Sequence, residues 1–183
     1  RLQAMAAPAR LDSCILPVRS VGVQGDSRTY RHPVLLWPQS THLPLWPQLI
    51  RTAAHIVNNS STVNRAVFGP GDYSSTSWRL RPQQCSRGPL DRLRRVDAIV
   101  RRHVEGIPEI WQCPVVSLPL EDEAGRQTFV LRPVCSSDAM TASVYPLDWE
   151  LFSHLRSAVR QVDGAGELFI DITTKPPGTI EWE

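Results

Sequence analysis

The sequence is nearly devoid of lysine, since nineteen of its twenty basic residues are arginine and Lys175 is the exception. Its apolar runs, such as Val34–Trp37, are far shorter than a membrane span, and Arg1–Arg10 lacks the features of a secretory signal. The four cysteines form no Cys-x-x-Cys pair and no Cys/His cluster, which argues against a structural zinc site. We therefore expect reduced cysteines and a cytoplasmic location.

Motifs that carry chemistry are also missing. The chain has no GxxxxGK[ST] phosphate loop, no Gly-Cys nucleophile elbow, and no HExxH spacing among its five histidines. The net charge of +2 is too small to indicate nucleic-acid binding. We therefore expect no catalytic residues and no metal site in this chain, and at most a contribution to a shared site.

What the sequence does contain is an internal repeat. Two apolar stripes at helical spacing lie 102 positions apart, and a short apolar strand follows each of them at the same offset. The matching pairs are Pro44/Pro146, Leu45/Leu147, Leu49/Leu151, Ile50/Phe152, Ala53/Leu155 and Val57/Val159. Half of this chain would form a core too small to fold on its own, so we expect the two copies to pack together.

Two strands are predicted before each helix, so each copy has the order β-β-α-β. The predicted strands are Ile15–Val23, Arg28–Leu36 and Ala66–Phe68 in the first copy, and Cys113–Leu120, Gln127–Val134 and Leu168–Ile170 in the second. Pro33 within a strand indicates an edge position or a bulge. The fold class we predict is α+β, with two tandem copies in one pseudo-symmetric domain joined by an Arg-rich helix.

The predicted boundaries follow from this repeat. Residues 1–13 are expected to be a tail or linker, 14–68 the first copy, and 69–89 a linker loop rich in Gly, Pro, Ser and Gln. Residues 90–183 would hold the connecting helix, Leu90–Val104, the second copy and a C-terminal segment. The arginines of that helix are compatible with nucleic-acid binding, but a solvated helix face is the favoured interpretation because no aromatic residues are interleaved.

Two segments carry a family resemblance. Leu16–Tyr30 reads LPVRSVGVQGDSRTY, and the chain ends in KPPGTIEWE, Lys175–Glu183, which we call the strap. Together they resemble the C-terminal dimerisation and XMP-binding domain of GMP synthetase, and Asp138–Ala142 (DAMTA) and Ile110–Pro114 (IWQCP) are similar to further segments of that family. The first hallmark lies in one copy and the second in the other, as in the longer tandem-copy form of these enzymes.

The resemblance implies a role in the ATP- and glutamine-dependent amidation of XMP to GMP. The glutaminase domain and the ATP-pyrophosphatase domain, with its Ser-Gly-Gly-Val-Asp-Ser loop, would lie elsewhere, in the same or a separate chain. ATP and Mg would bind there and not to this segment, which should be inactive by itself. The family's dimer interface would lie within one chain, so we expect a monomer in preference to a homodimer, with no nucleic-acid or membrane partner.

The resemblance also implies the residues that would bind XMP. They are Asp26 and Arg28 of the Gly-Asp-Ser-Arg turn, Gln112 before a strand, and Lys175, Thr179 and Glu181 of the strap. The ammonium of Lys175 would pair with the phosphate, and Pro176 and Pro177 would stiffen the backbone that carries it. The second copy lacks the Gly-Asp-x-Arg arrangement, which predicts one XMP site per chain.

Two other functions remain open from the sequence. The chain could be a stand-alone nucleotide-binding or interaction module with the same fold and no part in amidation. It could also be an RNA or DNA binder that uses the Arg-rich helix, which salt-dependent binding to generic nucleic acid would reveal.

Overall fold

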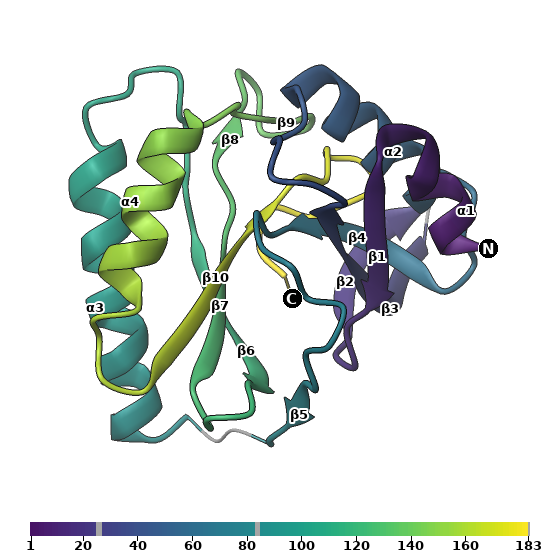
Figure 1. Cartoon of the computed structure of the whole chain (residues 1–183). Coiled ribbons are helices and arrows are strands. Elements are labelled where there is room, and N and C mark those ends of the chain that lie inside the picture. Colours follow the sequence, from purple (N-terminus) through teal and green to yellow (C-terminus); the bar gives the residue numbers. More distant parts are fainter. Residues whose placement is uncertain (25–26, 83–84, 183) are drawn as a thin grey trace.

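The computed structural model describes residues 1–24, 27–82 and 85–182 and has a mixed α+β fold (Figure 1). The predicted α+β class is confirmed. The elements in chain order are α1 (Leu2–Ala6), a 3₁₀ turn (Ala7–Ala9), β1 (Leu11–Ile15), β2 (Ser20–Gln24), β3 (Ser27–Pro38), α2 (Trp46–Asn58), β4 (Val63–Phe68), β5 (Arg79–Leu80), α3 (Arg87–Val104), β6 (Val115–Glu121), β7 (Gln127–Leu131), β8 (Val134–Cys135), β9 (Ser143–Val144), α4 (Trp149–Val159) and β10 (Ala165–Asp171).

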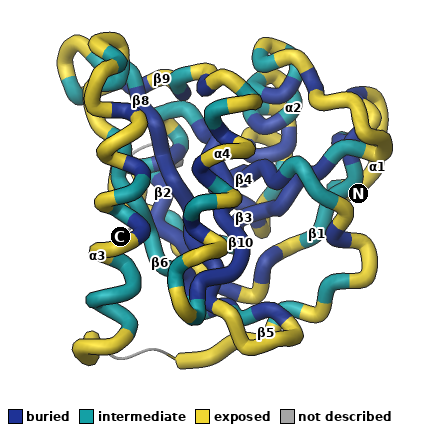
Figure 2. The backbone as a smooth tube through the Cα atoms, turned by 60° about the vertical axis from the view of Figure 1, so that its left-hand side comes forward, coloured by how far each residue is buried: buried dark blue, intermediate teal, exposed yellow. Residues whose placement is uncertain are grey.

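Eight strands of the described chain form one curled, mixed sheet in the order β1-β3-β4-β10-β7-β6-β5, with β2 also paired to β3. β3 and β4 run parallel, as do β7 and β10, whereas the hairpins β2–β3 and β6–β7 are antiparallel. β8 and β9 form a separate antiparallel pair. The central strands β4, β7 and β10 are buried along their whole length, and the dark blue of β4 and β10 is visible in Figure 2.

Both faces of the sheet are covered, because apolar residues alternate along the strands between two clusters. In β10, Leu168 and Ile170 belong to the cluster beneath the helices, and Phe169 between them belongs to the cluster on the opposite face. α3 and α4 cover the part of the sheet formed by β6 and β10, and α2 packs on β4 (Figure 1). The three predicted helices are confirmed as α2, α3 and α4, each with its apolar stripe turned to the core.

The first predicted strand is wrong as a single element. Ile15–Val23 is divided into β1 and β2, which pair with the second and the first half of β3. Pro17 lies in the break, where it cannot donate to a ladder, and His32 Nδ1 lies 2.6 Å from the carbonyl oxygen of Val18 at the same bend. Of the two alternatives predicted at Pro33, an edge position or a bulge, the structure shows the bulge, since β3 lies between β1 and β4 and the β3–β4 register shifts between His32 and Pro33.

Two segments predicted to be irregular contribute to the fold. Residues 2–13 form α1, the 3₁₀ turn and the start of β1, and Ala6 and Leu11 are buried, so this segment is not a free tail. A short Ala-rich helix is marginal in isolation and forms here because it packs on β1 and α2. In the segment 69–89, Tyr73 is buried and Arg79–Leu80 pairs with β6.

The two halves of the chain have the same order of connections. In each, a hairpin leads through one helix to a strand parallel to the second strand of that hairpin: β2-β3-α2-β4 and β6-β7-α4-β10. The second half differs in that the short pair β8–β9 lies between β7 and α4. The halves meet where β4 and β10 pair antiparallel. Their helices also meet, because the rings of Trp46 and Trp149 stack with centroids 4.5 Å apart, and Trp46 Nε1 donates to the carbonyl of Leu147.

Within the described residues, no helix has the length and apolar character needed to cross a membrane. The same part of the chain contains no group of three or more His, Cys, Asp or Glu side chains arranged to hold a metal ion. The four cysteines, all of them described, are not joined in disulfides. Burial raises the pKa of the Cys14 thiol to about 11, and burial with the Asp97 carboxylate raises that of Cys113 to about 12.

The packing of α4 on the sheet predicts a large cost for truncating Phe152, which is fully buried. Phe152→Ala should lower the free energy of unfolding by about 3–5 kcal/mol, because a cavity replaces the ring. The exposed neighbour His154 provides a control, and His154→Ala should change the free energy by no more than about 0.5 kcal/mol. Urea titrations followed by circular dichroism measure both, and equal effects of the two variants would contradict this packing.

Candidate functional site

The strap crosses the molecule between the two halves and is tied first to the β2–β3 hairpin. Gly178 forms a bridge with Gly22 of β2, the amide of Val23 donates to the carbonyl of Pro177 at 2.6 Å, and the amide of Val21 donates to Trp182. Close approach matters at Gly22, where an added Cβ would lie 3.0 Å from the Pro177 carbonyl oxygen. The segment that precedes the Gly-Asp-Ser-Arg turn therefore lies directly against the strap.

At its other end the strap is tied to the second half of the chain. The backbones of Lys175 and Ala142 exchange two hydrogen bonds, of 2.8 and 3.1 Å. Ala142 closes the Ser136–Ala142 loop between β8 and β9, and Val134 of β8 forms a bridge with Gln112. The strap thus links the hairpin of the first half to the segment that carries Gln112.

The predicted site residues differ in how the structure places them. Asp26 lies outside the described residues. Arg28 is exposed on β3, where it pairs with Val23. Gln112 is exposed beside a hollow of about 400 Å³ that Trp111 and Arg101 also line.

In contrast to the exposed Arg28 and Gln112, the predicted site residues of the strap form hydrogen bonds with other parts of the chain. Lys175 is half-buried, and its Nζ donates to the carbonyl of Ala139 at 2.5 Å. Thr179 Oγ1 accepts a hydrogen bond from Arg65 and donates to the carbonyl of Glu181. Glu181 directs an exposed side chain to solvent while its carbonyl accepts from Arg65.

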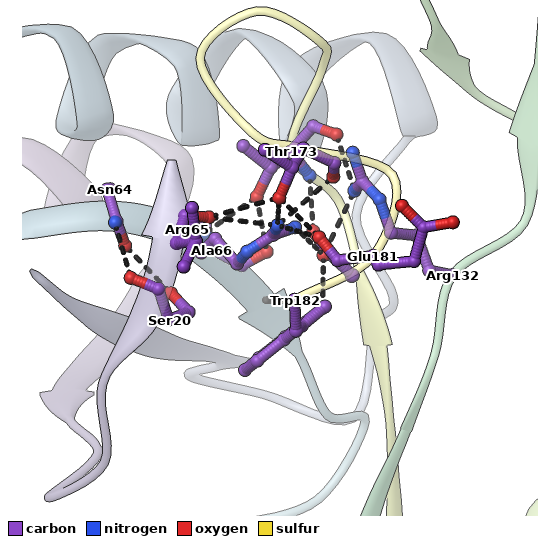
Figure 3. Close-up of polar contacts among 11 residues, drawn as sticks. Ser20, Asn64, Arg65, Ala66, Arg132, Thr173, Glu181 and Trp182 are labelled. Atoms are coloured by element: carbon purple, nitrogen blue, oxygen red, sulfur yellow. Dashed lines mark hydrogen bonds and ion pairs between the residues drawn. The ribbon is translucent and has the colours of Figure 1, made fainter. Parts of the chain in front are cut away.

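Arg65 of β4 is the residue that fixes the end of the strap (Figure 3). Its Nη2 donates to the Thr179 carbonyl at 3.0 Å, to Thr179 Oγ1 at 2.6 Å and to the Glu181 carbonyl at 2.8 Å. The same nitrogen donates to the carbonyl of Val21 in β2. One guanidinium group therefore connects the hairpin to two strap residues implied in nucleotide binding.

Asp171, at the end of β10, lies beneath the strap and binds both buried arginines. Its Oδ2 accepts from Arg65 Nη1 at 2.8 Å and from Trp182 Nε1 at 2.9 Å, and it lies 2.9 Å from Arg132 Nη1. Oδ1 accepts from the amide of Thr173. Burial by itself favours the neutral acid, but Arg132, Arg65 and the Thr173 amide outweigh it, so the pKa of Asp171 is held below its usual value.

This cluster carries a surplus of positive charge. Arg65, Arg132 and Asp171 are fully buried, and two guanidinium groups face one carboxylate. Burial lowers the pKa of Arg65 to about 10, although Asp171 opposes that shift. Several buried nitrogens have no protein acceptor among the described residues, namely Arg65 Nε and Arg132 Nε and Nη2. A buried cation with unused donors is costly unless an anion or another acceptor lies nearby.

Sequence reasoning missed this cluster. Each of the three charged residues directly flanks an apolar strand run: Arg65 before Ala66–Phe68, Arg132 after Phe129–Leu131 and Asp171 after Leu168–Ile170. The sequence does contain a signal for this pairing. A positive charge, Arg65, precedes one strand of the repeat and a negative charge, Asp171, follows the matched strand, and charges that become buried need partners of opposite sign.

An open hollow of about 820 Å³ lies beside the strap and the hairpin. Val23, Thr174, Pro176 and Pro177 form one wall, and Arg31 with the loop 58–61 forms another. Arg31 is fixed by a hydrogen bond to the Ser60 carbonyl. The hollow is polar and wide enough for a small ligand, as expected of a site at the end of strands.

A second charged cluster surrounds Glu167 of β10. Glu167 accepts from Tyr73, Arg156 and Arg160, and these hydrogen bonds and charges hold the pKa of Glu167 below its usual value despite its burial. Several arginines of α3 are likewise engaged, since Arg94 pairs with Asp91 and Arg101 with Asp97. These pairs favour the interpretation of α3 as a solvated face.

Comparison with known proteins agrees with the sequence resemblance. A family model described as the GMP synthase C terminal domain matches residues 99–182. The probable GMP synthase (glutamine-hydrolyzing) of Leptospira interrogans, serovar copenhageni, is 36% identical over 178 residues, which cover 94% of this chain and 29% of the relative. The probable GMP synthase of Caenorhabditis elegans is 32% identical over 200 residues, which cover 95% of this chain and 27% of that relative.

A third relative matches only about half of the chain. The GMP synthase of Leifsonia xyli subsp. xyli is 43% identical over 110 residues, which cover 54% of this chain and 22% of that relative. The chain spans less than a third of the length of each of these three proteins.

The buried ion cluster predicts that Asp171→Asn is strongly destabilising, because two buried guanidinium groups lose their counter-charge. The expected loss at pH 7 is about 3–5 kcal/mol of unfolding free energy. The folded pKa of Asp171 lies below the unfolded value of about 3.9, so its contribution is complete above that value and is lost as the pH falls.

Urea titrations between pH 7 and pH 2.5 test this prediction. The difference between wild type and Asp171→Asn should shrink as the pH falls below about 4. Asp163→Asn removes an exposed carboxylate and serves as the control, with an expected change within about 0.5 kcal/mol. A difference that stays constant down to pH 2.5 would show that the charge of Asp171 is not what stabilises the fold.

Proposed function

Because this chain belongs to the family of GMP synthase C-terminal domains, we propose that it binds XMP for an enzyme that amidates XMP to GMP. The nucleotide site lies between the strap and the β2–β3 hairpin. The observation that carries the proposal is their adjacency, since Val23 donates to Pro177 and Gly22 pairs with Gly178. Arg28 and Lys175, the cations implied by the resemblance, belong to these two segments.

The charge distribution around the strap supports an anionic ligand. The ammonium of Lys175 and the surplus positive charge of the Arg65–Arg132–Asp171 cluster lie on the strap and directly beneath it. A phosphate dianion is a strong acceptor for charge-assisted hydrogen bonds. Asp26 and Gln112 complete the proposed site through the sugar and base, and Thr179 and Glu181 contribute through hydroxyl, carboxylate or nearby amides.

The proposal extends to the organisation of the chain. We take the two β-β-α-β halves as tandem copies that replace a dimer of single copies, which is supported by their equal connectivity and by relatives that match either the whole chain or about half of it. The turn of the second copy, Glu121–Gly125, lacks the Gly-Asp-x-Arg arrangement. One nucleotide therefore binds per chain, and the chain is monomeric.

The remaining chemistry belongs to other domains in this proposal. Since the sequence has no phosphate loop, ATP, Mg and glutamine are handled in this proposal by pyrophosphatase and glutaminase domains with which this chain associates in the cytoplasm. Mixing the chain with a separately expressed pyrophosphatase domain should restore XMP amidation from ammonia. A stand-alone binding module would bind XMP but never restore activity.

The proposed phosphate contact predicts the effect of Lys175→Ala on XMP binding. The variant should bind XMP with an affinity lower by about tenfold or more, because a charge-assisted hydrogen bond is lost. Xanthosine has no phosphate, so its weaker binding should be the same in wild type and variant. Isothermal titration calorimetry of the purified chain gives both affinities and should show one XMP site per chain.

Arg28→Ala should weaken XMP in the same manner, and Arg102→Ala on the exposed face of α3 is the matched control. The proposal fails if Lys175→Ala and Arg28→Ala both bind XMP as well as Arg102→Ala does. Two equivalent XMP sites would contradict the assignment of a single Gly-Asp-Ser-Arg half-site.

A further inference from the structure

The Ser136–Ala142 loop has an internal structure that fixes the direction of one carbonyl group. Ser136 Oγ accepts from the amide of Ala139 at 2.9 Å and donates to the carbonyl of Thr141 at 2.6 Å. Asp138 Oδ1 accepts from the amides of Met140 and Thr141 at 3.0 and 3.1 Å. These amide hydrogen bonds, above all that from Thr141, lower the pKa of Asp138, so the acceptor is ionised at neutral pH.

Burial of side chains does not explain why the loop adopts this defined conformation. Met140 at its tip is 75% exposed, and Ala139 adopts a left-handed conformation with a φ of 61°. That conformation is unfavourable for a residue with a Cβ and persists only where its surroundings enforce it. Apolar packing occurs only at the base, where Ala142 contacts Val134 and Ile180 of the strap.

The carbonyl group whose direction the loop fixes is that of Ala139, and its oxygen accepts a hydrogen bond from the ammonium of Lys175. Nζ lies 2.5 Å from Ala139 O, while the backbone of the same lysine pairs with Ala142. The loop therefore holds Lys175 at both its main chain and its charged end. An ammonium has three donors, and among the described residues Ala139 accepts from one of them, which leaves two for a ligand.

We infer that the Ser136–Ala142 loop positions the ammonium of Lys175 for the phosphate of the bound nucleotide, with Asp138 and Ser136 as its positioning residues. This inference rests on the proposed function, because it requires Lys175 to contact the phosphate. A lysine side chain is long and mobile and loses rotamer freedom on binding. The Ala139 carbonyl restricts that freedom before the ligand arrives, and pre-organisation of this kind strengthens binding.

The test is a double-mutant cycle on XMP affinity, measured by calorimetry on the purified chain. Asp138→Ala should weaken XMP by about fivefold when Lys175 is present and by less than about twofold in the Lys175→Ala background. Asp138→Asn keeps an acceptor oxygen and should retain most of the affinity. Ser136→Ala frees the amide of Ala139 and is a second variant with the same expected result as Asp138→Ala.

Asp148→Ala provides a matched control, because Asp148 Oδ1 also accepts two backbone amides, at 2.9 and 3.0 Å, but caps α4 instead. It should change XMP affinity by less than about twofold at a comparable loss of stability. The inference is overturned if Asp138→Ala or Ser136→Ala weakens XMP equally in both backgrounds, or not at all, while Lys175→Ala alone has its expected effect. If Lys175→Ala alone has no effect, the proposed function fails and the inference fails with it.

Discussion

A single buried carboxylate holds together three parts of the chain that are far apart in sequence. Asp171 ends β10, and its oxygens receive Arg65 from β4, Arg132 from the end of β7 and Trp182 from the strap. Arg65 in turn binds the carbonyls of Val21, Thr179 and Glu181. The junction of the two halves, the β2–β3 hairpin and the strap therefore depend on one ion cluster, and replacing it with apolar packing would leave the strap's carbonyls without a donor.

The charge of the same cluster is a reason why we propose an anionic ligand for this surface. Two guanidinium groups against one carboxylate leave a positive charge that water does not screen, because all three groups are fully buried. The strap lies over that charge and carries the only lysine of the sequence. A ligand phosphate would balance the surplus, so ligand binding and the stability of the strap are expected to be linked.

Much of the fold could be predicted from the sequence, because the apolar periodicity of α2, α3 and α4 and the strands after α2 and α4 follows local rules. What escaped prediction depends on tertiary contacts. The short helix α1 forms only against α2 and β1, and Pro17 divides a strand whose apolar pattern looked continuous. Lys175 was predicted to be a site residue, but the acceptor of its ammonium is the backbone carbonyl of Ala139, 36 positions away, which no pattern of side chains reveals.

The central claim is that the strap and the hairpin form one anion site around Lys175. Because the chain has a single lysine, its side-chain ammonium gives a single, unambiguous signal in a nitrogen-15 NMR spectrum of the labelled protein. Addition of XMP should shift that signal and saturate at one nucleotide per chain. A Lys175 signal that does not move while calorimetry shows XMP to be bound would place the nucleotide elsewhere and contradict this account.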